Sequence, residues 1–138
     1  MAQKLRLREA GPAVLDLRRF WIERLEYQED EELPVDLPEP AVRVSRPEIL
    51  ESDADDYFVT LRLRVAQGEA RAIDLTIVGV FRLQSGGESQ ARLLRMLEYN
   101  GSAILFSAAR GMIESVTGVS GFGRMGVPSI DLAELIER

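Results

Sequence analysis

The 138-residue chain contains neither cysteine nor histidine. Without a thiol, it has no disulfide, no thiolate nucleophile and no sulfur ligand for zinc. Without an imidazole, it lacks the base of the common hydrolase triads and the most frequent metal ligand. An enzyme built from this chain would have to work with carboxylates. The absence of cysteine suits a protein of the reducing cytosol.

Long apolar runs and a positive net charge are also missing. No stretch of about 18 consecutive apolar residues occurs, so the sequence predicts no membrane-spanning helix. The first ten residues are basic and alternate in polarity, and they lack the apolar segment of a signal peptide. The net charge of −6 disfavours binding to phosphate backbones. We therefore expect a cytoplasmic protein that neither inserts into membranes nor binds nucleic acid.

The first half of the chain carries strand signals. Alternating or β-branched segments predict strands over 20–27, 41–45, 57–66 and 72–83, with a hairpin at Gly68 between the last two. The alternation of the first strand slips at Glu23 and Arg24, as it does at a bulge. Residues 14–17 either extend this strand or form a separate one. Residues 28–40, with three prolines, and the polar stretch 46–56 are predicted as surface connections.

The second half of the chain carries helix signals. We expect helices over 89–98, 101–117 and 128–138, with Ser85 or Ser89 capping the first and Ser129 the last. The glycine-rich stretch 118–126 ends the principal helix. Its predicted core stripe comprises Leu105, Ala108, Ala109, Met112, Val116 and Val119, widened by Phe106 and Ile113.

Strands followed by helices are typical of the α+β class, with the helices on one face of an antiparallel sheet. The long strands support this arrangement because each has one apolar face and one polar face. We predict a single domain over residues 1–138, which can bury about two-thirds of its unfolded surface. Residues 1–17 are expected to form an N-terminal extension or an extra strand, and no C-terminal tail is expected.

Two short motifs carry little weight. Gly121-Phe-Gly-Arg-Met-Gly126 fits the glycine spacing of a dinucleotide-binding loop, but a helix precedes it and no strand feeds it. Asp53-Ala-Asp-Asp56 lacks the further oxygen ligands and the turn glycine of a calcium loop. We therefore predict no cofactor and no metal.

Two features of the proline-rich connection allow more than one interpretation. The acidic run Glu29–Glu32 is either a solvated stretch that protects a sheet edge or a docking patch for a basic partner. Apolar side chains follow among the prolines and must lie against something. They either cover the protein's own core or form one wall of an apolar groove for extended polypeptide; these side chains are Leu33, Val35, Leu37 and Val42.

The order of motifs in the second half resembles the SecB family of cytosolic export chaperones. Thr76-Ile-Val-Gly-Val-Phe81 ends a long strand, and Ala103-Ile-Leu-Phe-Ser-Ala-Ala-Arg110 opens the longer helix. A glycine-rich loop and Pro128 then precede a terminal helix. The first strand, Phe20-Trp-Ile-Glu-Arg-Leu25, is similar as well, so the resemblance runs from about Phe20 to about Leu135.

The resemblance implies a four-stranded antiparallel sheet with helices on one face, in protomers that assemble as a dimer of dimers, a homotetramer. It implies an ATP-independent chaperone that is not an enzyme and that holds unfolded or pre-secretory polypeptides in apolar grooves for protein export. In this family the crossover after the first strand and the terminal helix line the groove. In this sequence the client-binding residues would be Leu33, Val35, Leu37 and Val42, with Ile130, Leu132 and Leu135.

The resemblance also implies a docking partner, the translocase ATPase SecA, which binds acidic residues on the exposed sheet face. The corresponding residues here are Asp74 on that face, with Glu29 and Asp30 after the first strand. Arg62 and Arg64 share the exposed face with Asp74. The family's tail that also contacts SecA has no counterpart, because the sequence stops at Arg138 on a predicted helix.

Two alternatives remain open. The missing tail favours a SecB-like chaperone dedicated to one client, such as the antitoxin of a toxin–antitoxin–chaperone system. A protein of another class, an enzyme that uses carboxylates, would draw on Asp53, Asp55, Asp56 and Glu69. Nothing in the sequence places two of these carboxylates in one pocket.

Overall fold

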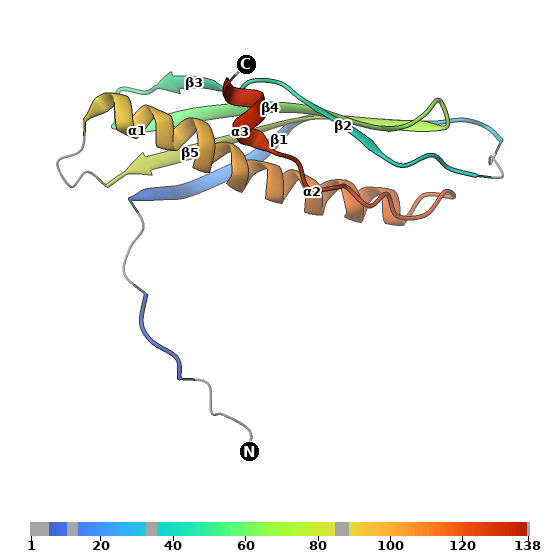
Figure 1. Cartoon of the computed structure of the whole chain (residues 1–138), viewed down its shortest axis with the longest axis horizontal. Coiled ribbons are helices and arrows are strands. Elements are labelled where there is room, and N and C mark those ends of the chain that lie inside the picture. The colour runs from blue at the N-terminus through green and yellow to red at the C-terminus, as the bar shows by residue number, and fades with distance from the viewer. Residues whose placement is uncertain (1–5, 11–13, 33–35, 85–88, 138) are drawn as a thin grey trace.

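A computed structural model of the chain describes residues 6–10, 14–32, 36–84 and 89–137, with side chains up to residue 134 in the last range. It is an antiparallel sheet covered on one face by a long helical segment (Figure 1). The strands are β1 Leu15–Glu29, β2 Ala41–Val44, β3 Glu48–Glu51, β4 Asp56–Gln67 and β5 Arg71–Leu83. The helices are α1 Gln90–Met96, the π-helical η1 Leu97–Gly101, α2 Ser102–Gly118 and α3 Leu132–Glu137.

The sheet is four strands wide. Its order is β1-β5-β4-β2, and β3 pairs with β4 at the same edge as β2, further along the strand. β1 is therefore an edge strand, with a neighbour among the described residues on one side only. This arrangement confirms the predicted α+β fold with helices on one face of an antiparallel sheet.

The strand predictions hold with one exception. β1 includes 15–17 as well as 20–27, and its register shifts between Ile22 and Arg24, which confirms the predicted bulge. Gly68 turns the β4–β5 hairpin with a positive φ of 56°. The predicted polar loop 46–56 is wrong, because β3 lies within it. The alternation of apolar and polar residues did not reveal β3, because the strand is only four residues long and places one apolar side chain, Ile49, on the covered face.

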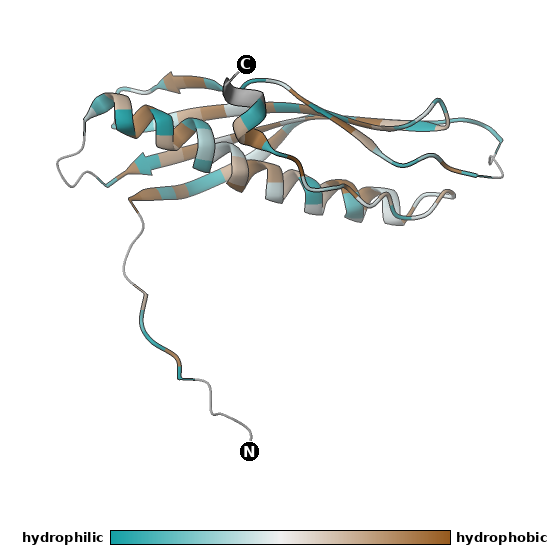
Figure 2. Ribbon diagram, viewed as in Figure 1, coloured by the Kyte–Doolittle hydropathy of each residue, from teal (hydrophilic) through white to brown (hydrophobic). Residues whose placement is uncertain are grey.

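The core lies between the sheet and the helices. Along β4, every second residue from Tyr57 to Val65 is buried, and Figure 2 shows the matching alternation of hydropathy along the strands. Gly79 lets the helix approach β5 closely: a Cβ there would lie 2.7 Å from Cδ2 of Leu105 and 2.9 Å from Cε2 of Phe81. The absence of a side chain at this position thus brings the start of α2 against the sheet.

The predicted core stripe of the principal helix was partly wrong. The buried apolar residues of α2 are Leu105, Phe106, Ala109 and Ile113. Met112 is 37% exposed and Val119, just beyond the helix, is 89% exposed. The helix carries apolar residues on two faces, and only one of them can contact its own sheet. Periodicity alone could not separate these faces.

The helix termini also differ in part from the prediction. Ser89 caps α1, because its side chain accepts a hydrogen bond from the backbone N–H of Arg92 at 3.3 Å. α3 begins at Leu132 rather than near Pro128, and Asp131 caps it in place of Ser129. The Asp131 carboxylate accepts backbone hydrogen bonds from Ala133 at 3.1 Å and Glu134 at 3.4 Å. Residues 119–131 instead form a non-helical return segment.

Candidate functional site

The return segment, residues 119–131, runs back along α2 (Figure 1). Two of its backbone N–H groups donate to helix side chains: Met125 to Oγ1 of Thr117 at 2.9 Å, and Val127 to Oε1 of Glu114 at 3.3 Å. Both Met125 and Val127 are buried. Side-chain acceptors on α2 therefore bind two N–H groups of an extended segment that pairs with no strand in the described part of the chain.

A buried arginine joins three separate segments at the far end of the sheet. Arg71, only 3% exposed, donates to Oε1 of Gln67 at 2.6 Å and to the carbonyl of Gly123 at 2.5 Å. Gln67 in turn donates to the carbonyl of Pro38 in the proline-rich crossover at 2.9 Å. The hairpin, the return segment and the crossover are thus tied together. No sequence pattern indicates this role, because one arginine in a strand resembles any other.

The predicted client-binding residues have different positions in the structure. Val42, Ile130 and Leu132 are half-buried and pack against the same core, and Leu37 is half-buried in the crossover. Leu33 and Val35 lie outside the described residues. Leu135 is placed in α3, but its side chain lies outside the described part.

Several large apolar side chains that were not predicted to bind clients are exposed. Phe20 is 46% exposed and Trp21 is 38% exposed, both on the edge strand β1. On α2, Ile104 and Met112 are each 37% exposed. Clusters of exposed apolar side chains mark surfaces that contact other molecules more often than isolated ones do. Edge strand and helix therefore both present apolar groups to solvent.

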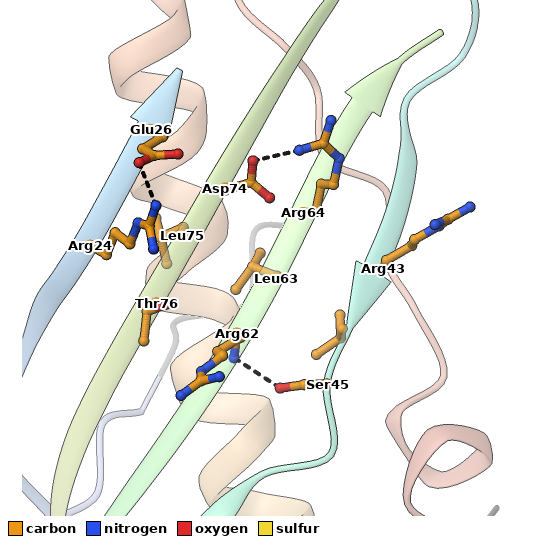
Figure 3. A pocket seen from close by; sticks show the side chains of 11 residues that line it. Arg24, Glu26, Arg43, Ser45, Arg62, Leu63, Arg64, Asp74, Leu75 and Thr76 are labelled. Atoms are coloured by element: carbon orange, nitrogen blue, oxygen red, sulfur yellow. Dashed lines mark hydrogen bonds and ion pairs between the residues drawn. The ribbon is translucent and has the colours of Figure 1, made fainter. Parts of the chain in front are cut away.

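The uncovered face of the sheet holds a pocket of about 520 Å³ (Figure 3). Its charged lining consists of four arginines and two carboxylates: Arg24, Arg43, Arg62, Arg64, Glu26 and Asp74. Arg24 pairs with Glu26 and Arg64 with Asp74, each at 2.5 Å. The hydrogen bond to Glu26, followed by its Coulombic attraction, raises the pKa of the Arg24 guanidinium above its ordinary value.

The predicted docking carboxylates do not share one face: Asp74 lies on the uncovered face, whereas the alternation of β1 places Glu29 on the covered side with Tyr27. Asp74 is paired with Arg64, so its charge is already offset. Glu29 accepts a hydrogen bond from the Tyr27 hydroxyl at 2.8 Å, and the backbone N–H of Asp30 donates to the carbonyl of Ala70 at 2.8 Å. The register places Glu29 three positions along the β1–β5 ladder from the level of Asp74.

The candidate carboxylates of the enzyme alternative are scattered. Asp56 pairs with Arg82 at 3.0 Å, while Asp53 and Asp55 are exposed in the turn before β4 and Glu69 is exposed at the hairpin. Across the described residues, no group of three or more acidic side chains could hold a metal ion. In that same part of the chain, no helix is long and apolar enough to cross a membrane.

Comparison with solved structures identifies the fold. The chain is similar to the Mycobacterium tuberculosis SecB-like chaperone Rv1957, solved in complex with a ChAD peptide from the Rv1956 HigA1 antitoxin. The TM-score is 0.69 at 13% identity, over 85% of this chain and 90% of that chain. A protein of unknown function from Streptococcus agalactiae aligns with a TM-score of 0.45 and 15% identity, over 85% of this chain and 97% of that one. No protein-family model and no curated protein matches the sequence. The chain therefore has a SecB-like fold.

Proposed function

We propose that this protein is an ATP-independent holdase that binds unfolded polypeptides along apolar surfaces and keeps them from folding or aggregating. The observation that carries the proposal is the SecB-like fold combined with exposed apolar side chains on the edge strand β1. The similar Rv1957 was solved with a peptide bound, which supports a polypeptide as the ligand class here. The proposal requires no catalytic residue and no cofactor.

Binding of an unfolded chain needs apolar contacts and partners for its backbone. Half-buried side chains of the crossover, β2, the return segment and the start of α3 supply the apolar contacts, at Leu37, Val42, Ile130 and Leu132. The outer edge of β1 supplies unpaired backbone groups, since among the described residues it has a strand on one side only. Extended peptides add to such edges through main-chain hydrogen bonds, while apolar pockets select side chains.

We also propose that the protomers assemble as a dimer of dimers. The outer face of α2 supports this assembly because it carries exposed Ile104 and Met112. Gly111 and Gly118 on the helix have open space where a Cβ would lie, so a second helix could approach closely. Light scattering tests the proposal directly: a mass near 15.4 kDa would contradict it.

The range of clients divides the proposal into two versions. An export chaperone of the cytoplasm would dock on SecA through Glu29, Asp30 and Asp74. A chaperone dedicated to one client, such as an antitoxin, needs no such docking. The pairing of Asp74 with Arg64 and the surrounding arginines favour the dedicated version. Capture from a lysate distinguishes them: one dominant client supports the dedicated version, and many precursors with SecA support export.

The test of holdase activity is suppression of aggregation of a chemically denatured client, together with slowed refolding. Leu37→Asp should weaken the suppression because it places a charge on the proposed apolar wall. Leu7→Asp is the matched control, since Leu7 is 95% exposed in the N-terminal segment. A wild-type protein that neither slows refolding nor suppresses aggregation would refute the holdase proposal. If Leu37→Asp and Leu7→Asp have equal effects, the crossover is not part of the client-binding surface.

A further inference from the structure

The pocket on the uncovered sheet face is positive in an otherwise acidic protein. Its lining includes four arginines and two carboxylates, whereas the whole chain has a net charge of −6. Such a local reversal of sign attracts groups of the opposite charge, even when the molecule as a whole repels them. It lies on the face of the sheet opposite the helices, so the proposed client groove does not account for it.

The strand register brings the arginines together around Thr76. Arg24 on β1 and Arg62 on β4 both lie directly opposite Thr76 of β5, one on each side. In the neighbouring row, Arg64 on β4 lies directly opposite Arg43 on β2. Like charges at directly opposed positions of a sheet are unfavourable. The fold therefore retains an arrangement that a bound anion would relieve.

Two of these arginines have no close carboxylate. Arg24 and Arg64 are offset by their 2.5 Å pairs with Glu26 and Asp74. For Arg62 the ion-pair partner is Glu48 at 4.0 Å, and both side chains are about two-thirds exposed. Arg43 forms no ion pair with any described residue. The excess positive charge of the pocket thus belongs to Arg43 and Arg62.

We propose that this pocket docks an acidic peptide segment, an extended stretch of a partner protein with carboxylates at alternating positions. Alternate residues of an extended chain are about 6.8 Å apart, and the same distance separates the row of Arg62 from the row in which Arg43 lies opposite Arg64. Guanidinium groups match the planar, two-oxygen geometry of carboxylates. The pocket thus offers the right charge and the right spacing for such a segment.

An apolar patch extends the pocket along the same face. Trp21 lies opposite Val78, two residues beyond Thr76 on β5, and its ring meets that of Phe58 edge-on with centroids 6.5 Å apart. A peptide whose carboxylates sit over the arginines can therefore place a large apolar side chain against Trp21. We expect the preferred ligand to combine alternating acidic residues with a neighbouring apolar residue.

A single-stranded nucleic acid would also use arginines and aromatic rings. The pocket favours a peptide because Glu26 and Asp74 lie among the arginines and would repel closely spaced phosphates. The net charge of −6 disfavours a polyphosphate further. A peptide can avoid the two carboxylates, because its own charges are separated by uncharged residues.

The test uses the full chain and a fluorescein-labelled peptide of sequence Gly-Glu-Ser-Glu-Ser-Leu-Gly, followed by anisotropy. The test variant is Arg43→Gln combined with Arg62→Gln, which leaves both 2.5 Å ion pairs in place. The control is Arg92→Gln with Arg95→Gln, exposed positions on α1 that change the net charge equally. We expect about tenfold weaker binding for the test variant and an unchanged affinity for the control. Binding should also weaken as salt increases.

Four results would overturn the proposal. They are no binding by the wild type, equal binding by the test variant, equal loss in the control pair, and equal binding of a peptide with Gln in place of Glu. Tighter binding of oligothymidine than of the peptide would likewise replace the acidic-peptide assignment with nucleic acid. The emission of Trp21, the only tryptophan, gives a second readout of occupancy. Aggregation suppression by the test variant should stay at the wild-type level, which separates this site from the holdase groove.

Discussion

The two faces of the sheet use the same strands in opposite ways. Along β4, Leu61 points into the core and is fully buried, while the next residue, Arg62, points to solvent with a side chain 64% exposed. Even arginine behaves differently on the two faces: Arg71 is buried and bound to neutral oxygens, whereas Arg64 is exposed and bound to a carboxylate. Burial of apolar side chains on the covered face therefore stabilises the fold. The side chains of the uncovered face contribute less to stability and can contact a partner.

The largest test of this contrast compares the neighbours Leu61 and Arg62. Leu61→Ala should lower the free energy of unfolding by about 2–5 kcal/mol, because it leaves a cavity under the helix. Arg62→Ala should change it by less than about 1 kcal/mol, since its ion pair is long and exposed. Urea denaturation followed by circular dichroism measures both. Similar losses for the two substitutions would contradict the division of labour between the faces.

The second prediction concerns the buried arginine. Arg71→Met keeps the length of the side chain but leaves Oε1 of Gln67 and the carbonyl of Gly123 without their donor. We expect a loss of about 1–3 kcal/mol in unfolding free energy. Hydrogen exchange should rise most in residues 119–123, because the return segment loses its attachment. If hydrogen exchange rises only in β2, Arg71 does not hold the return segment in place.

A third prediction compares two glycines, Gly79 in the packed core and Gly111 on the open side of α2. Gly79→Ala puts a methyl group 2.7 Å from Leu105 and should cost about 1–3 kcal/mol through overpacking. Gly111→Ala has open space around it and should raise stability by about 0.5–1 kcal/mol, because alanine favours the helix. Thermal denaturation should show a lower melting temperature for Gly79→Ala and a higher one for Gly111→Ala. If Gly111→Ala also blocks assembly in light scattering, the outer face of α2 is a packed interface.

The smallest predicted effect belongs to the Arg64–Asp74 pair. A double-mutant cycle with Arg64→Gln and Asp74→Asn should give a coupling of about 0.2–1 kcal/mol, since both groups are nearly half exposed. The coupling should fall further at high salt. A coupling above about 2 kcal/mol would show that the uncovered face contributes substantially to stability.

Much of the fold was predictable because alternation of apolar residues is a local property. β4 and β5 follow from it directly, and the slip at Ile22 to Arg24 in β1 marked the bulge correctly. β3 was missed because four residues are too few to establish a period. The capping of α3 by Asp131 was missed because Ser129 is an equally good cap by residue type.

The candidate site was less predictable. The alternation of one strand placed Arg62 and Arg64 beside Asp74, but the excess of arginines over carboxylates also depends on Arg24 and Arg43, which cross-strand register brings to the same face. The role of Arg71 depends on contacts with residues 49 and 52 positions away. The client-binding residues Leu37, Val42, Ile130 and Leu132 keep their predicted role as a proposal, with half-buried positions compatible with it.

The sequence by itself determined the α+β class, the alternation of the long strands and the exclusion of thiol and imidazole chemistry. These follow from residue types and from short-range periodicity, which need no knowledge of partners. Only the tertiary structure decided which apolar face of α2 meets the sheet, where the return segment is attached and which charges meet on the uncovered face. Each of these depends on residues that are distant in the chain and are brought together when the helix packs on the sheet.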